Sequence, residues 1–179
     1  MNGMKFLRAG TVVCMVVFGI MTCRAGVGPT IEHCFNTLGG RIAYNVDYTI
    51  GTVDGSFVYT CDEGASFGLT SGSKICILLA GGDDFVTTSK VTGLREIKVY
   101  VEKANPSKDI DITKIKIYAS TTGTWGDPLT CETTSGVVTA TIPVGSYYVK
   151  IAYTGSNTAA LSQIDYYRSD CNCQPYVAP

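Results

Sequence analysis

Tyrosines and lysines at alternate positions of three stretches are the side chains best suited to binding chemistry. In each stretch every second residue is apolar, and the positions between hold an aromatic ring close to an ammonium group. A ring face stacks on the C–H face of a sugar while nearby donors bind its hydroxyl groups. The pattern indicates a glycan-binding face; the alternative is an aromatic and lysine ladder that only stabilises a solvated sheet. The residues are Lys98 and Tyr100, Lys116 and Tyr118, and Tyr148 and Lys150.

Trp125 is the only tryptophan of the chain. Its indole face suits stacking on a pyranose ring, so it is a further candidate ligand-binding residue. The alternative is a tryptophan at a turn that folds back onto the protein, as the preceding Ser120–Thr124 segment suggests.

Catalytic chemistry finds little support in the residue types. His33 is the only histidine, so a Ser-His-Asp or Cys-His mechanism would depend on it entirely, and no nucleophile-elbow sequence occurs. A paired-carboxylate glycosidase depends on spacing in three dimensions, but one small domain leaves little room for a substrate cleft. The sequence therefore predicts a protein that is not an enzyme.

Short alternating runs separated by turns must position these side chains. No segment keeps a 3.6-residue period, and glycine and proline fall mostly between the runs, which predicts an all-β, antiparallel β-sandwich with jelly-roll topology. Residues 62–72 are expected to form a loop, and the Gly81–Asp84 cluster a hairpin turn. The predicted strands are 31–38, 41–50, 56–61, 73–80, 85–89, 96–102, 114–118, 137–142, 147–153 and 161–167.

The first 25 residues predict a secretory signal peptide. Lys5 and Arg8 precede an apolar run over 11–21, and cleavage is expected after Ala25; a lipid anchor on Cys23 is the alternative. The domain then spans 26–170, followed by a short tail over 171–179. It carries 11 basic and 15 acidic residues, which makes nucleic acid an unexpected partner. No second long apolar segment follows the signal, so no stable membrane span is expected after cleavage.

The order of the motifs resembles the jelly-roll accessory modules of secreted Bacteroidetes-type proteins, whose shape is related to carbohydrate-binding and discoidin-like sandwiches. The resemblance implies a non-catalytic binding module that occurs beside glycan-active enzymes, nucleases and adhesins. Members have few cysteines and are usually fused to a larger domain, in contrast to this chain. The resemblance rests on 32–36, 55–59, 77–88, 91–94, 97–100, 120–125, 145–151 and 164–165.

In this fold the first and last strands are neighbours, which brings Glu32 and Asn36 close to Asp165. Carboxylate and amide oxygens suit a structural calcium ion, as similar jelly rolls often carry. The alternative is an exposed acid pair without an ion. No other cofactor is expected.

Six cysteines remain after signal cleavage, and an even number in an exported chain favours disulfides over scattered buried thiols. Cys61 and Cys76 bracket the predicted loop; closing it would stabilise the fold by about 3 kcal/mol. Cys34 is expected to pair with Cys171 or Cys173, leaving the other for Cys131.

These observations together predict a secreted or cell-surface binding module. A glycan is the expected ligand, and a cell-surface protein is the alternative partner. In that second case the chain is a structural or adhesion module without a sugar ligand.

Overall fold

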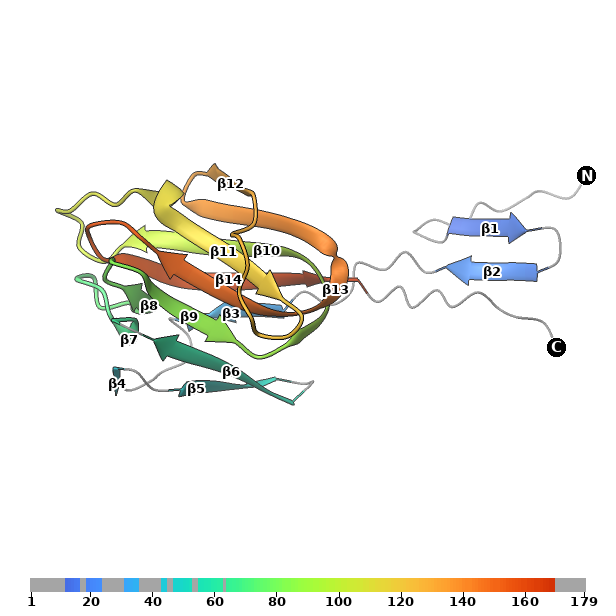
Figure 1. Ribbon diagram of the computed structural model, residues 1–179, viewed down its shortest axis with the longest axis horizontal. Helices are drawn as coiled ribbons and strands as arrows, with labels where there is room; N and C mark the ends of the chain where they lie inside the picture. The colour runs from blue at the N-terminus through green and yellow to red at the C-terminus, as the bar shows by residue number, and fades with distance from the viewer. Residues whose placement is uncertain are drawn as a thin grey trace, which may run out of the picture.

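The computed structural model describes residues 12–16, 19–23, 31–35, 43–44, 47–52, 55–62 and 64–169. Two strands near the N-terminus, β1 (Val12–Val16) and β2 (Gly19–Cys23), pair only with each other. The remaining strands form an antiparallel sandwich of two sheets (Figure 1). No helix among the described residues is long and apolar enough to cross a membrane.

The first sheet is built around β14 (Ala159–Arg168) and β10 (Val91–Lys103), which pair with each other. Beyond β14 lie β8, β7 and β4, with β3 pairing further along β14; beyond β10 lie the first half of β13 and then β12. The bounds are β3 (Ile31–Cys34), β4 (Ala43–Tyr44), β7 (Ser66–Leu69), β8 (Ile75–Leu79), β12 (Cys131–Thr134) and β13 (Val137–Tyr153).

The second sheet has the order β5, β6, β9, β13, β11. Its remaining strands are β5 (Asp47–Thr52), β6 (Gly55–Asp62), β9 (Asp84–Thr88) and β11 (Ile115–Ser120). A 3-10 turn, η2 (Ile112–Lys114), leads into β11, and the Asp111 side chain accepts a hydrogen bond from the Thr113 amide at its start.

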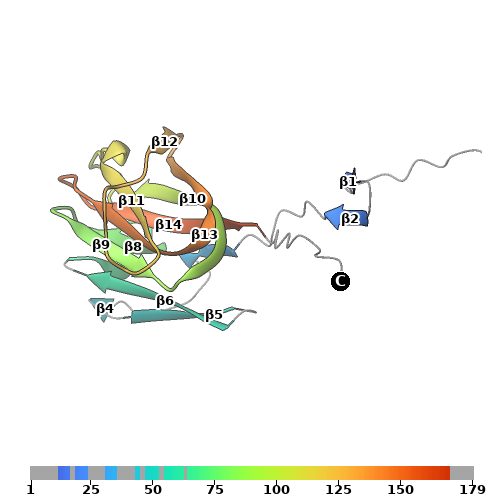
Figure 2. The ribbon, with the colours of Figure 1, turned by 45° about the vertical axis from the view of Figure 1, so that its right-hand side comes forward.

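Strand β13 belongs to both sheets. Residues 137–141 pair with β10, and 148–153 pair with β11, with the register shifting between the two halves. The strand bends at one end of the molecule (Figures 1 and 2). Pro143 and Gly145 lie in sequence between its two halves. Proline has no amide to donate and glycine tolerates sharp bends, so both suit a bend. The two strands predicted over 137–142 and 147–153 are therefore halves of one.

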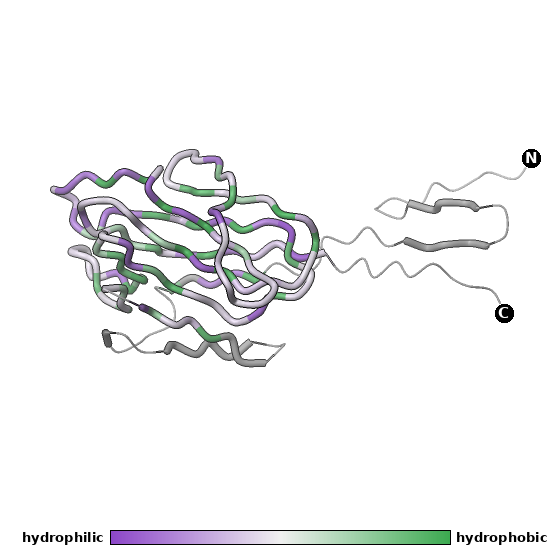
Figure 3. Tube along the Cα trace, viewed as in Figure 1, coloured by the Kyte–Doolittle hydropathy of each residue, from purple (hydrophilic) through white to green (hydrophobic). Residues whose placement is uncertain are grey.

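Alternate residues of the two sheets meet in a common core. Ile97 and Val99 from the first sheet and Ile117 and Ile151 from the second are fully buried. Apolar and polar residues alternate along the strands, as the sequence predicts for sheets with one buried face (Figure 3). The all-β antiparallel sandwich is confirmed; the jelly-roll connectivity stays a prediction.

The segment from Gly81 to Asp84 is not a hairpin, contrary to the sequence-based interpretation. β8 lies in the first sheet and β9 in the second, so the turn carries the chain from one layer to the other. Gly81, Gly82 and Asp83 all have positive φ, at 103°, 72° and 84°. The Asp84 carboxylate accepts hydrogen bonds from the amides of Gly64 (3.0 Å) and Ala80 (2.7 Å), which fixes the corner.

Two short strands were not predicted from the sequence pattern. β7 lies inside the segment 62–72, which was predicted to be a loop because Ser66 and Gly68 are residue types common in turns. A Cβ on Gly68 would come within 2.6 Å of the Leu78 side chain, so the glycine permits close approach of β8. β12 has a mostly exposed Cys-Glu-Thr-Thr sequence without an apolar stripe.

Candidate functional site

The structure divides the three predicted tyrosines between two opposite faces. Tyr118 and Tyr148 lie on the outward face of the second sheet, whereas Tyr100 lies on the outward face of the first. The core residues between the sheets fix these directions, because Val99 and Ile117 point inward from the same strands. Periodicity shows which side of a strand is buried but not which sheet the strand joins.

Lysine and aromatic side chains interleave on the outward face of the second sheet. Tyr118 lies directly opposite Lys150 in the pairing of β11 with β13. The Lys150 ammonium lies 3.9 Å from the Phe85 ring centroid and 5.5 Å from that of Tyr118. One cation thus bridges two rings, an arrangement that is favourable because the ring faces are electronegative. The sequence analysis did not single out Phe85 as a candidate binding residue. It lies on β9, where it points outward as Thr87 does.

Two further lysines extend this face. The Lys90 ammonium lies 5.3 Å from the Tyr148 ring centroid and donates a hydrogen bond to the Thr121 carbonyl at 2.9 Å. The Lys116 ammonium donates to the Thr113 carbonyl at 3.3 Å. We call this surface the lysine–aromatic face and define it by Phe85, Lys90, Lys116, Tyr118, Tyr148 and Lys150.

The lysines of this face have no ion pair among the described residues, as is also true of Lys108 and Lys114 outside it. Lys74, Lys98 and Lys103 pair with Glu102, Glu96 and Asp109. Within the part of the chain that the structure describes, Lys90, Lys116 and Lys150 make no such contact. Asp111 interacts electrostatically with Lys116 at longer range, which contributes to lowering the pKa of that carboxyl after its hydrogen bonds with Thr113. The face therefore carries positive charge that is not neutralised in contact.

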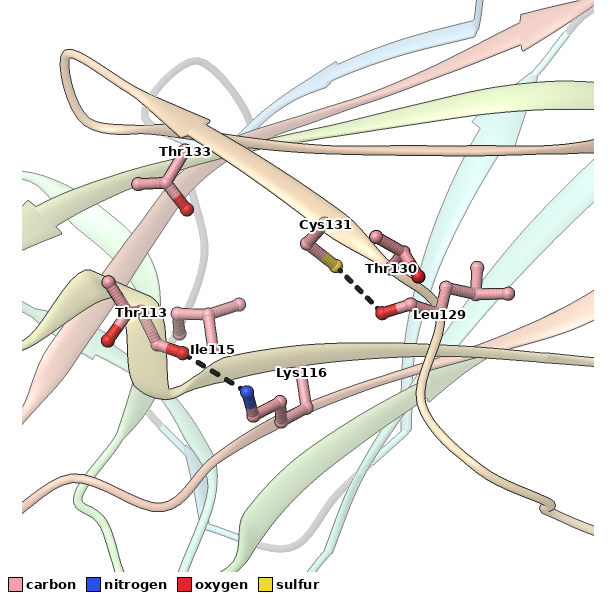
Figure 4. A pocket seen from close by; sticks show the side chains of 7 residues that line it. All are labelled: Thr113, Ile115, Lys116, Leu129, Thr130, Cys131 and Thr133. Atoms are coloured by element: carbon pink, nitrogen blue, oxygen red, sulfur yellow. Dashed lines mark hydrogen bonds between the residues drawn. The ribbon is translucent and has the colours of Figure 1, made fainter.

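A groove adjoins this face between β11 and β12, the edge strands of the two sheets. It encloses about 470 Å³ (Figure 4). The Cys131 thiol donates to the Leu129 carbonyl at 3.4 Å, and burial raises the pKa of this thiol. The Leu129 amide donates a hydrogen bond to the Ile117 carbonyl at 2.8 Å, which holds the segment before β12 against β11. Hydroxyl groups and one ammonium group offer donors to a polar ligand. The lining residues are Thr113, Ile115, Lys116, Leu129, Thr130, Cys131 and Thr133.

On the outward face of the first sheet, several polar side chains form hydrogen bonds or ion pairs with one another. Asp165 is only 2% exposed, accepts a hydrogen bond from the Gln163 amide at 2.8 Å and is bonded by the Tyr100 hydroxyl. Burial, followed by the contact with Asp165, raises the pKa of Tyr100 to about 12. The Lys98 ammonium lies 4.7 Å from the Tyr167 ring centroid and pairs with Glu96 at 3.4 Å. Tyr100 and Lys98 thus hold the sheet face together.

The predicted neighbourhood of Glu32 and Asp165 is confirmed, because the two residues are directly paired between β3 and β14. Asn36 lies outside the described residues. Among the described residues no three His, Cys, Asp or Glu side chains are grouped to hold a metal ion. The calcium site stays a prediction.

His33 is enclosed in the core and is only 3% exposed. Its Nδ1 lies 2.6 Å from the Tyr59 hydroxyl, which is 3.1 Å from that of Tyr166. Burial lowers the pKa of His33 to about 4, although the charge of Asp165 opposes the shift. The Phe35 ring packs edge-on against Tyr59 beside it. A histidine in these surroundings is a core residue and does not reach a substrate.

Trp125 and the cysteines complete the predicted set. Trp125 is partly exposed in the connection between β11 and β12. Cys61 lies on β6 and Cys76 on β8, both buried and in different sheets. Cys34 lies on β3, while Cys171 and Cys173 fall outside the described residues. The predicted disulfide pairings stay predictions.

Comparisons with known proteins are sparse. No family model matches the chain, and no curated protein matches it. Among solved structures, the chain is similar to the K2 cleaved adhesin domain of Lys-gingipain (Kgp), with 14% sequence identity and a TM-score of 0.40. The match covers 77% of this chain and 99% of that chain.

Proposed function

We propose that the protein is a non-catalytic binding module that acts in adhesion at or outside the cell surface, with a glycan as its ligand. The lysine–aromatic face carries this proposal. Three ammonium groups lie there, two of them over aromatic rings, without ion pairs in the described part of the chain and beside a groove with hydroxyl groups in its lining.

The chemistry of this face suits a sugar. Tyr118 and Tyr148 are partly exposed, so parts of their rings are open to stacking against C–H groups. Ammonium groups and threonine hydroxyls bind sugar hydroxyl groups. The enclosure of His33 in the core supports a role without catalysis, because the chain has no other histidine. Export through the predicted signal peptide belongs to the same proposal.

A glycan array probed with matched tyrosine variants tests the proposal. We expect wild type to bind a subset of glycans and Tyr118→Ala or Tyr148→Ala to weaken binding by about tenfold, since the contact of one aromatic ring is worth on the order of 1 kcal/mol. Tyr100→Ala is the control, because it removes the same side chain from the opposite sheet. Failure to bind any glycan, or binding that survives both Tyr118→Ala and Tyr148→Ala, contradicts the proposal.

A second candidate is adhesion to a protein through the edge of the first sheet. Among the described strands β12 pairs with β13 alone, and three of its four residues are exposed. Such an edge accepts an added strand from a partner. Self-association on size-exclusion chromatography that Thr133→Pro abolishes would favour this candidate over a sugar ligand.

A further inference from the structure

The three ammonium groups of the lysine–aromatic face are distributed along β11. That of Lys116 rests on the Thr113 carbonyl just before the strand begins. That of Lys150 lies beside the Tyr118 ring within the strand, and that of Lys90 rests on the Thr121 carbonyl just after its end. A six-residue strand is about 20 Å long, so the cations form a line of roughly that length.

This line of charge is a local feature of an acidic chain, whose formal net charge is −1. Each ammonium is held by a carbonyl oxygen or a ring face, and neither neutralises its charge. Two carboxylates lie close to this surface: Asp62 on β6 lies across from Phe85, and Asp111 lies just before β11. The three lysines outnumber them and have no ion pair among the described residues. An anionic ligand is therefore complementary to this surface.

We infer that the glycan bound by this face is an acidic polysaccharide, with carboxylate or sulfate groups, lying along β11. The inference rests on the proposed function and specifies its ligand class. A single acidic sugar would use one of the three cations, whereas a polymer with charge on successive repeats engages all of them. The partly exposed rings of Tyr118 and Tyr148 beside the line suit the apolar faces of sugar rings, which an acidic polypeptide lacks.

Two pairs of polymers separate charge from sugar stacking. Polygalacturonate is compared with its methyl-esterified form, and dextran sulfate with dextran. Each pair shares a backbone and differs in charge. We expect each charged polymer to bind at least about tenfold more tightly than its neutral counterpart. The affinity should fall as the salt concentration rises, because lysines that contact the polymer displace its counterions.

Lysine variants test whether the preference for charged polymers depends on the lysine–aromatic face. Lys90→Gln, Lys116→Gln and Lys150→Gln are each expected to weaken binding of the charged polymers about two- to fivefold and to reduce its salt dependence. Lys74→Gln and Lys103→Gln are the controls, since both remove an exposed lysine with its own acidic partner. Their binding should equal that of wild type.

The outcomes distinguish this inference from the proposed function. Equal binding of charged and neutral polymers, lost in Tyr118→Ala but unchanged in the lysine variants, overturns the acidic ligand and leaves glycan binding intact. Binding of poly-glutamate as tight as that of polygalacturonate overturns the sugar component and indicates an acidic protein partner. Absence of binding to every charged polymer overturns the inference, and absence of binding to any glycan on the array overturns the proposed function as well.

Discussion

One buried histidine makes the folded state sensitive to acid. The pKa of His33 is about 4 in the folded chain and about 6.5 in an unfolded one, so the unfolded state takes up a proton first. Its contribution to the free energy of unfolding is therefore constant above about pH 6.5, falls as the pH drops towards 4, and levels off below that value. The difference corresponds to about 3 kcal/mol.

We expect denaturant unfolding at pH 7.5, 5.5 and 4.5 to show this loss in wild type. His33→Gln removes the titrating ring and should lose less stability over the same range. Acidic residues also titrate there, so the relevant quantity is the difference between the two proteins. Parallel loss of stability in both would show that His33 does not titrate in this way.

At the scale of strands, the corner between β8 and β9 depends on one glycine more than on its neighbour. A Cβ on Gly81 would lie 2.2 Å from the Gly155 carbonyl oxygen, whereas a Cβ on Gly82 meets nothing within 4 Å. Both have positive φ. We expect Gly82→Ala to cost about 1 kcal/mol from backbone strain alone, and Gly81→Ala about 3 kcal/mol or more. Equal thermal stability of the two variants would contradict a steric role for Gly81.

The alternating pattern predicts strands well but not their partners. Residues 97–101 and 115–117 have the buried face that the sequence indicates. The turn at 81–84 was misread because glycine and aspartate mark a reversal of direction both within a sheet and between sheets. β7 was missed because Gly68, which lets β8 approach, reads as a loop residue.

At the scale of the molecule, the two outward faces of the sandwich carry different side chains. The closeness of Glu32 to Asp165 on neighbouring strands was predicted correctly, and the structure adds that the two residues are directly paired. The grouping of the tyrosines failed because strand order decides which face each one joins. Phe85 and Lys90 were missed because each is a single residue in or after a short strand, without a repeated pattern to single it out.

Ligand binding should therefore depend on which side of the sandwich is accessible. Thr141 lies outward on the first sheet and Thr87 outward on the second. We expect a chain attached to a sensor surface through an azide-bearing residue at position 141 to bind the glycan as free protein does. Attachment at position 87 should reduce binding at least about tenfold, because it brings the surface against the lysine–aromatic face. Equal binding in both orientations would locate the ligand elsewhere.

The bent strand β13 has a mechanical consequence for the proposed role in adhesion. Tyr148 and Lys150 lie in its second half, while its first half is hydrogen-bonded to β10 and β12. Tension applied by a tethered ligand at this face passes along one continuous backbone into both layers. The two layers cannot separate without breaking the strand pairing of one half of β13, so we expect the domain to resist pulling as a single unit.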